Sequence, residues 1–203
     1  MISETIKTLM QKLKRGGRMK DDLEKWLKGM GERFMRKVGI RRGHVVLDFG
    51  CGSGNYTIPV ARIVGNEGIV YALDKDAKSL DKLMKRAESE GLKNIRRIDT
   101  SGEIEIKLSD NSVDVVLLYD IFWYFPPWDP KLIELLSEVY RVSKPTALIS
   151  VLPKHVDPAM LKEKVEEAGF KLKNKLCGII IHGDRLEEGC VLNFIKKHSF
   201  QYI

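Results

Sequence analysis

The chain has 203 residues, of which 43% are hydrophobic and 31% are charged, a composition typical of one globular domain with a full apolar core. It contains no apolar run near the roughly 20 residues that a membrane span needs, and its first residues lack the apolar core of a secretory signal. The cysteines Cys51, Cys177 and Cys190 form no C-x-x-C pair. We therefore expect no metal site and a cytoplasmic protein with reduced thiols.

The formal net charge of +7 is unevenly distributed along the chain. Residues 1–42 hold 13 Lys and Arg but only five Asp and Glu, so the remainder is close to neutral. A basic segment can bind nucleic acid, an anionic lipid surface or an acidic substrate, although a solvated basic helix is the simpler interpretation. Nucleic acid is therefore an alternative partner that is not favoured, and the sequence leaves the oligomeric state open.

Amphipathic helical patterns occupy the N-terminal part of the chain. One helix is predicted over residues 2–14 and a second over residues 21–38, where apolar residues recur on one face. Gly29 and Gly31 weaken the second helix, so a kink or an end is expected there. Residues 1–40 are thus predicted to form a basic helical segment in front of the main domain.

The main domain is organised around HVVLDFGCGSGNYT, residues 44–57. A short β-branched run, typical of a buried parallel strand, ends in Asp48, and glycines follow at alternate positions before a helical pattern begins at Tyr56. Strand, glycine turn and helix in this order are typical of the first unit of a nucleotide-binding α/β domain. Glycine permits the sharp turn and the close approach of a ligand, and the helix N-terminus offers free N–H groups.

The spacing of these glycines argues against a dinucleotide ligand. Dinucleotide-binding proteins use G-x-G-x-x-G, whereas residues 50–54 of this chain give G-x-G-x-G. A carboxylate at Asp48 would repel phosphates and suit a cationic ligand. An NAD-type oxidoreductase is therefore a weaker alternative. A second alternative is a glycine-rich turn that has only a structural role and binds no ligand.

Further strands and helices alternate after the glycine turn. The second strand, residues 69–73, ends in Asp74, which is placed to bind ribose hydroxyls or, alternatively, to cap the helix predicted over residues 76–90. The third strand is predicted over residues 94–98. The polar segment 101–112 either links directly to the next strand or adds an edge strand through alternating apolar residues.

The fourth strand, residues 113–118, is nearly all β-branched or Leu and is expected to be buried on both faces. Ligands of open parallel sheets bind beyond the carboxyl ends of the strands. One or two aromatic residues there are expected to line a dry substrate pocket, with at least half of them packed beneath it. Six of the chain's 16 aromatic residues follow this strand: Tyr119, Phe122, Trp123, Tyr124, Phe125 and Trp128.

The C-terminal part of the chain continues the alternation. A helix over residues 129–142, a strand over 147–152 and a helix over 159–168 are predicted. Two extended segments, residues 170–181 and 189–196, are joined by a polar loop. They are interpreted as the antiparallel pair that closes the sheet.

The D-x-G-x-G-x-G pattern in VLDFGCGSGN resembles the first motif of class I S-adenosylmethionine (SAM) dependent methyltransferases, in particular the small-molecule type of ubiquinone and menaquinone biosynthesis. The acidic tip of strand two, the aromatic rim and the Lys-Pro and Ala-Gly-Phe landmarks extend the resemblance over residues 40–197. It implies an α/β fold, a Rossmann-like three-layer α/β/α sandwich whose seven-stranded sheet has six parallel strands and one antiparallel strand. Residues 41–203 would be the SAM-binding domain, and residues 1–40 would either cover the pocket as a lid or pack against the sheet.

The resemblance also implies SAM as cosubstrate and a small-molecule acceptor, methylated by in-line attack on the sulfonium methyl. A SAM-binding protein without catalysis is the alternative, since no base is marked by a motif. A base is needed only if the nucleophile must lose a proton, and the weak candidates are Asp120, Tyr119, Tyr124 and His155. The cofactor-binding residues implied by the resemblance are Asp48, Gly50, Cys51, Gly52, Gly54, Asn55, Asp74, Lys75, Asp99, Thr100 and Tyr119.

Overall fold

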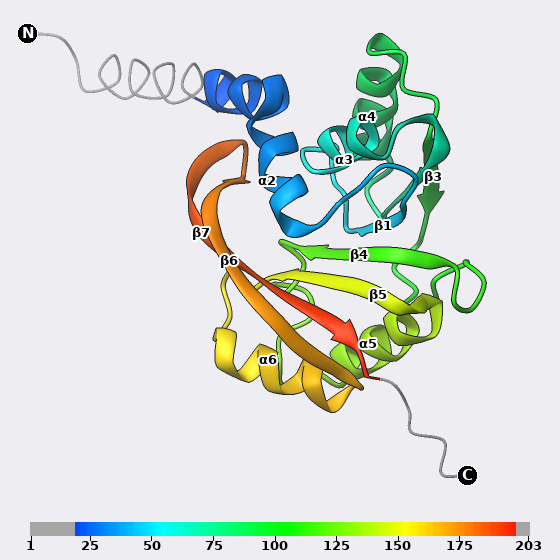
Figure 1. Cartoon of the computed structure of the whole chain (residues 1–203), viewed down its shortest axis with the longest axis vertical. Helices are drawn as coiled ribbons and strands as arrows, with labels where there is room; N and C mark the ends of the chain where they lie inside the picture. The colour runs from blue at the N-terminus through cyan, green and yellow to red at the C-terminus, as the bar shows by residue number, and fades with distance from the viewer. Residues whose placement is uncertain (1–18, 198–203) are drawn as a thin grey trace, which may run out of the picture.

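The computed structural model of the chain describes residues 19–197, so the helix predicted over residues 2–14 lies outside the described part (Figure 1). One seven-stranded sheet has the order β3-β2-β1-β4-β5-β7-β6, in which only β7 is antiparallel to its neighbours. The predicted count of six parallel strands and one antiparallel strand is confirmed. The strands are β1 (Val45–Phe49), β2 (Ile69–Asp74), β3 (Ile95–Asp99), β4 (Val113–Tyr119), β5 (Ser143–Leu152), β6 (Phe170–His182) and β7 (Arg185–Lys196).

Helices cover both faces of this sheet and give the expected three layers. One apolar core lies between the sheet and α2, α3 and α4, and a second lies between the sheet and α5 and α6. Successive residues of β4 serve the two cores in turn, with Leu117 in the first and Leu118 in the second. In the described part of the chain, no helix has the length and apolar character that crossing a bilayer requires. The helices are η1 (Trp26–Met30), α2 (Gly31–Val38), α3 (Thr57–Val64), η2 (Gly65–Glu67), α4 (Ala77–Ser89), α5 (Pro130–Val142) and α6 (Pro158–Glu167).

The predicted second N-terminal helix is helical over residues 19–38 but is interrupted at Gly29, whose φ of 128° is not helical. The expected kink is therefore confirmed. Just beyond it, a Cβ on Gly31 would lie 2.8 Å from the ring of Trp26, so only glycine allows the chain to pass this closely. Trp26 is fully buried, and its ring packs edge-on against that of Tyr56 at the start of α3. The described part of the segment thus packs on the main domain, and its role as a lid stays a prediction.

Residues 101–112 form no strand, so the edge-strand interpretation is wrong. The segment is held instead by a side chain from α5. The guanidinium of Arg141 donates hydrogen bonds to the carbonyl oxygens of Ile106, at 2.7 Å, and of Leu108, at 2.9 Å. Ile106 is fully buried against the second core. The apolar alternation here therefore reflects packing against the second core, in which Ile104 and Leu108 are partly buried beside Ile106, rather than strand pairing.

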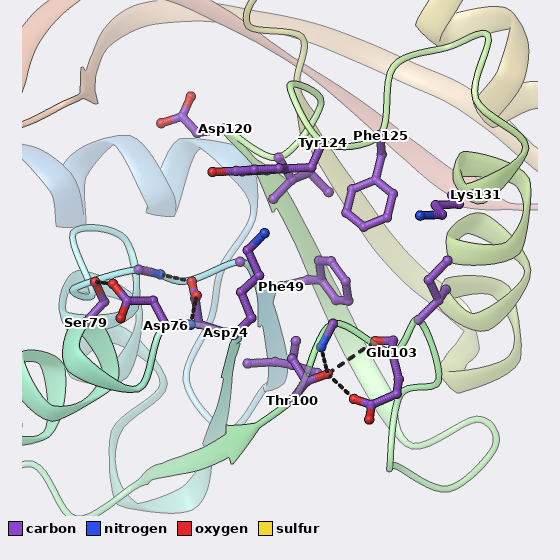
Figure 2. Close-up of a pocket in the computed structure, with 17 residues that line it drawn as sticks. Phe49, Asp74, Asp76, Ser79, Thr100, Glu103, Asp120, Tyr124, Phe125 and Lys131 are labelled. Carbon is purple, nitrogen blue, oxygen red and sulfur yellow. Dashed lines mark hydrogen bonds between the residues drawn. The ribbon is translucent and has the colours of Figure 1, made fainter.

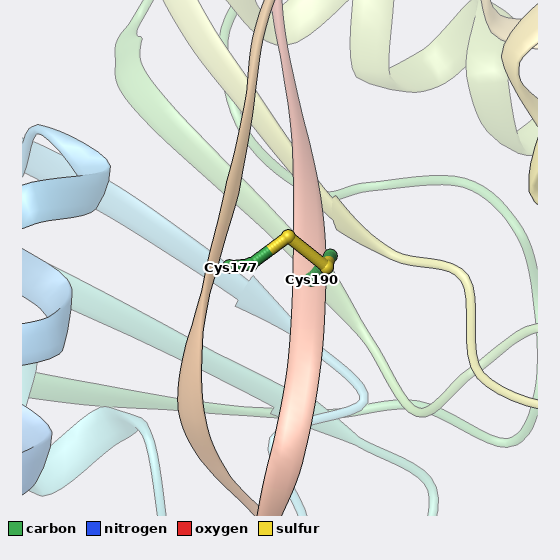
Figure 3. Close-up of a disulfide and its surroundings, with 2 residues drawn as sticks. All are labelled: Cys177 and Cys190. Carbon is green, nitrogen blue, oxygen red and sulfur yellow. A yellow bond between two sulfur atoms is a disulfide. The ribbon is translucent and has the colours of Figure 1, made fainter.

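The strands β6 and β7 form a long hairpin around Gly183 and Asp184, whose φ values of 52° and 60° suit a tight two-residue turn. Cys177 and Cys190 face each other in its register and form a disulfide (Figure 3). The prediction that the thiols are reduced is wrong for this pair. The 12 residues between the two cysteines conceal a direct cross-strand pair, which appears only once the hairpin register is known.

Candidate functional site

A cavity of about 460 Å³ opens at the carboxyl ends of β1, β2 and β4 (Figure 2). The strand order reverses between β1 and β4, and such a switch point is where open α/β sheets bind ligands. The volume is also in the range of ligand pockets. Four carboxylates and two ammonium groups line it, so it suits a cationic ligand better than a pyrophosphate. They belong to Asp74, Asp76, Glu103, Asp120, Lys75 and Lys131.

The three alternating glycines serve different purposes in the loop after β1. A Cβ on Gly50 would lie 2.5 Å from Ile121, and a Cβ on Gly54 would lie 2.3 Å from Leu83. A Cβ on Gly52 would meet no atom within 4 Å, and Gly52 lines the cavity. Gly50 and Gly54 are therefore required by packing, whereas Gly52 leaves open space in which a ligand can approach the backbone.

The carboxylate of Asp74 ties the tip of β2 to this loop. Its Oδ2 accepts a 2.7 Å hydrogen bond from the Gly52 amide, and its Oδ1 accepts a 2.8 Å bond from the Asp76 amide. The N-cap of α4 is Asp76, which accepts a bond from the amide of Lys78, so the interpretation of Asp74 as the helix cap is wrong. Asp74 lines the cavity in the position where ribose hydroxyls can bind.

Asp48 lies beneath the loop and does not line the cavity. Its carboxylate is 2% exposed and accepts a 2.6 Å hydrogen bond from Thr57 Oγ1. Burial raises the pKa of this carboxyl to about 7; the bond from Thr57 opposes the rise and the charge of Asp74 adds to it. The charge of Asp48 would therefore act on a ligand through the loop rather than by direct contact.

The loop after β3 and two phenylalanines close another part of the cavity. Hydrogen bonds from its own backbone amide, Thr100 and Ser101 lower the pKa of Glu103 to about 2. The rings of Phe49 and Phe125 meet edge-on with centroids 6.0 Å apart and give the cavity an apolar wall. Sequence reasoning missed Glu103, which lies in an unpatterned linker, and Phe49, which looks like an ordinary strand residue.

Five of the predicted cofactor-binding residues line the cavity together: Gly50, Gly52, Asp74, Lys75 and Thr100. They come from the ends of three neighbouring strands, β1, β2 and β3. The Lys75 ammonium lies 4.1 Å from the centre of an aromatic ring on the opposite side, that of Tyr124. Such a contact orders the lysine and gives the cavity a partly aromatic cover.

The structure does not bring the other predicted residues to the cavity lining. The Asn55 amide donates a 2.7 Å bond to Asp184 in the hairpin turn. The carboxylate of Asp99 is paired with Arg97 at 2.6 Å and is largely exposed. Cys51 and Gly54 are buried within the loop, and burial raises the pKa of the Cys51 thiol.

The four candidate bases are placed very differently. Tyr119 is buried, its hydroxyl lies 2.6 Å from Ser150 Oγ, and burial raises the pKa of that hydroxyl, so it is poorly suited to take a proton. Tyr124 and Asp120 line the cavity. His155 lies in the loop after β5, next to His182, which could not be identified from the sequence because no motif marks the end of β6.

The aromatic rim divides into three pairs. Tyr124 and Phe125 line the cavity, as expected for one or two of the six residues. Tyr119 and Phe122 are buried, and Phe125 is partly buried against the second core, so half of the six residues pack beneath the rim as predicted. The remaining pair, Trp123 and Trp128, is 70% and 72% exposed.

Residues 46–146 match the family model of a methyltransferase domain. The match runs from β1 into β5 and includes the glycine loop, Asp74 and Asp120. These residues form a class I SAM-dependent methyltransferase domain. The family predicted from the D-x-G-x-G-x-G pattern is therefore confirmed.

Curated relatives of the methyltransferase domain include a demethylmenaquinone methyltransferase of Lactobacillus johnsonii, 30% identical over 124 residues. The alignment covers 61% of this chain and 49% of that relative, so the chain spans about half the length of the curated relatives it matches. A solved SAM-dependent methyltransferase from Aquifex aeolicus superposes with a TM-score of 0.65 at 24% identity, covering 82% of this chain and 89% of that one. The [4+2]-cyclase SpnF superposes with a TM-score of 0.64 at 16% identity, covering 83% and 82%. The fold is confirmed, and the cyclase illustrates that the fold alone does not fix the reaction.

Proposed function

We propose that this chain is a SAM-dependent methyltransferase that methylates a small-molecule acceptor by in-line displacement. The observation that supports it is the acidic cavity built from the glycine loop and Asp74, with open space over Gly52. A cosubstrate that carries an ammonium and a sulfonium, and no phosphate, fits a lining of four carboxylates and two ammonium groups. A dinucleotide would place two phosphates against the same carboxylates, which disfavours the oxidoreductase.

Different residues of the cavity would bind different parts of SAM. Asp74 would accept hydrogen bonds from the ribose hydroxyls, while Phe49, Leu73 and Ile104 would provide apolar contact for the adenine base, beside the polar Thr100. When bound, SAM supplies a methyl group made electrophilic by the sulfonium. Holding the acceptor in line and excluding water would then supply much of the rate, and we assign this to Tyr124 and Phe125, the two aromatic residues after β4 that line the cavity.

The proposal also extends to the identity of the acceptor, the cellular location of the protein and the role of the N-terminal segment. The name of the Lactobacillus relative makes demethylmenaquinone the first acceptor to test. A cytoplasmic location stays a prediction, and the Cys177–Cys190 disulfide bears on it because disulfides are rare in reducing compartments outside heat-adapted organisms. A role of residues 1–40 as a lid is likewise proposed, not observed.

The first experiment is calorimetric titration of the full chain with SAM, S-adenosylhomocysteine and, as a control, NAD. Wild type is expected to bind the first two with micromolar affinity, and Asp74→Ala to weaken both about tenfold or more, because two hydrogen bonds to a charged acceptor are lost. Asp99→Ala is the matched control: Asp99 pairs with Asp74 in the β2–β3 register, but its carboxylate is held by Arg97. Binding of NAD alone would contradict the proposal.

Turnover separates the remaining alternatives. Transfer of a radiolabelled methyl group from SAM to any acceptor in a small-molecule panel would exclude a binding protein without catalysis. Methylation of RNA or DNA, with steep salt dependence of binding, would instead favour the nucleic-acid alternative suggested by the basic N-terminal segment.

A further inference from the structure

Three ionisable side chains from three separate segments meet at one end of the cavity. Asp120 follows β4, His155 lies in the loop after β5, and His182 ends β6. Asp120 Oδ1 lies 2.9 Å from His182 Nδ1, within ion-pair distance, and both atoms are buried without a hydrogen-bond partner within residues 19–197. His182 Nε2 lies 3.2 Å from His155 Nε2, and His155 is exposed. The three side chains therefore form a continuous row from the cavity to the surface.

The backbone at both ends of this row is held in an unusual conformation. Asp120 has a φ of 57° and His155 a φ of 65°, in the left-handed region that non-glycine residues seldom adopt. Such conformations persist where the surroundings impose them, and they cluster at active sites. The rings of Trp123 and His155 are nearly perpendicular, with centroids 5.2 Å apart, so the indole packs against the imidazole.

The row begins at the end of the cavity remote from the ribose site. Figure 2 shows Asp120 at the top of the lining, near Tyr124, and Asp74 well below it, beside Asp76. If Asp74 held the ribose of SAM, Gly52 and Asp120 would be the lining residues available to the sulfonium part of the molecule. The acceptor would then meet the methyl group near Asp120.

We propose that Asp120 is the general base of the methyl transfer and that His182 and His155 pass the proton on to water; this rests on the proposed function. The acceptor atom forms its bond to the methyl carbon while the carbon–sulfur bond breaks, and the electron pair of that bond stays on sulfur in S-adenosylhomocysteine. The acceptor's proton moves to Asp120 and then along the row. The substrate class is thereby narrowed to acceptors whose attacking atom carries a proton, such as a hydroxyl or an acidic C–H, in contrast to tertiary amines and thioethers.

The ionisation of Asp120 depends on groups from several elements. His182 faces it from β6, His155 and Lys154 from the loop after β5, and Tyr56 from the start of α3. Burial raises the pKa of the Asp120 carboxyl, while the contact with His182 and the charges of His182, His155 and Lys154 lower it. A carboxylate with a raised pKa is a stronger base than an ordinary one, and removing His182 is expected to raise the pKa of Asp120 further.

The test uses two ligands that differ at the reacting centre and needs no known acceptor. S-adenosylhomocysteine lacks the methyl group, and sinefungin carries an amine on a carbon in place of the sulfonium. Asp120→Asn is expected to reduce the preference for sinefungin about tenfold, since one charge-assisted hydrogen bond is lost, and to leave the affinity for S-adenosylhomocysteine within about threefold. The same preference should fall as the pH drops through the pKa of Asp120, and His182→Gln should move that midpoint to higher pH. Asp99→Asn, outside the cavity, should change neither quantity.

Other outcomes would overturn the assignment. If Asp120→Asn lowers the affinity for both ligands equally, Asp120 contacts the amino-acid part that the two ligands share. If the affinity for neither ligand changes, Asp120 lies away from the ligand. If the pH midpoint does not move in His182→Gln, then His182 does not influence the ionisation of Asp120. If wild type binds neither ligand, the proposed function is wrong, and the assignment of Asp120 as general base is wrong as well.

Discussion

The amide of Gly52 donates a 2.7 Å hydrogen bond to the carboxylate of Asp74, which joins the glycine loop after β1 to the tip of β2. The carboxylate that we propose binds the ribose therefore also fixes the backbone that borders the open part of the cavity. A second bond, from the Asp76 amide, holds the other carboxylate oxygen. Binding and loop geometry are coupled at this one side chain, so substitutions in the loop should separate into those that affect the ligand and those that affect the fold.

Gly52→Ala is expected to abolish SAM binding while the chain still folds. The added methyl group meets no protein atom, but it occupies the ligand's space, and a non-glycine residue at a φ of 52° costs about 1 kcal/mol. Gly54→Ala is the matched contrast, because its Cβ would lie 2.3 Å from the buried Leu83 and so costs about 1–3 kcal/mol more through overpacking. Thermal melts and calorimetry on both variants check this. A melting temperature lower for Gly52→Ala than for Gly54→Ala would contradict it.

Asp48→Asn is expected to stabilise the protein at pH 8 and to change little at pH 4. The pKa of Asp48 is about 7 in the folded state and about 3.8 when unfolded, so the folded state favours the protonated carboxyl. The stability that this gives is fully present below pH 3.8 and is lost as the pH rises to about 7, where the buried carboxyl must ionise. Asparagine carries no charge to bury and its side-chain oxygen can still accept the bond from Thr57. The free energy of unfolding should therefore rise by at most roughly 4 kcal/mol at pH 8, measured by urea denaturation at both pH values.

Asp114→Asn is the control of opposite sign. Burial alone would raise the pKa of Asp114, but the hydrogen bond from Lys144 outweighs it and lowers that pKa. The ionised form of Asp114 therefore stabilises the fold at pH 8. This variant should lose stability at pH 8 and lose less at low pH. An equal effect of Asp48→Asn at pH 4 and pH 8 would mean that its carboxyl titrates normally.

Removing the Cys177–Cys190 disulfide is expected to lower the melting temperature. Closing a loop of this length restricts the unfolded chain and stabilises the fold by about 3 kcal/mol, which corresponds to roughly 6–12 °C for a domain of this size. The double variant Cys177→Ala/Cys190→Ala and reduced wild type should therefore melt alike. Thiol titration of the unfolded, unreduced protein should find one thiol, that of Cys51, and three would exclude the disulfide.

The sequence is sufficient for features that depend on local patterns. The period of the apolar residues predicts the helices and strands, and the spacing of Gly50, Gly52 and Gly54 predicts the loop, because turn geometry is determined by neighbouring residues. The tip of β2 follows from the length of the apolar run that precedes it. The position of Asp74 at the carboxyl end of that strand could therefore be predicted from local pattern alone.

Features that depend on register or on distant segments could not be predicted in this way. Cys177 meets Cys190 only because the hairpin turns at two particular residues, and His182 reaches Asp120 from a strand 62 positions later in the chain. Asp99 is predicted to bind the cofactor but does not line the cavity, and its carboxylate is bound by Arg97, two positions earlier. Side-chain pairing of this kind leaves no periodic signal in the sequence.

Trp26→Phe tests how the N-terminal segment is attached to the methyltransferase domain. The Trp26 indole donates a 2.7 Å hydrogen bond to the carbonyl oxygen of Asn55, whose side chain in turn holds Asp184 of the hairpin turn. Phenylalanine leaves that carbonyl without its donor and the ring site partly empty, so the free energy of unfolding should fall by about 1–3 kcal/mol. Trp128→Phe, on a side chain 72% exposed, should change it by less than about 0.5 kcal/mol. Because Trp26 does not line the cavity, SAM affinity should fall by only a few-fold; a large loss of affinity with unchanged stability would instead favour a lid that closes over the ligand.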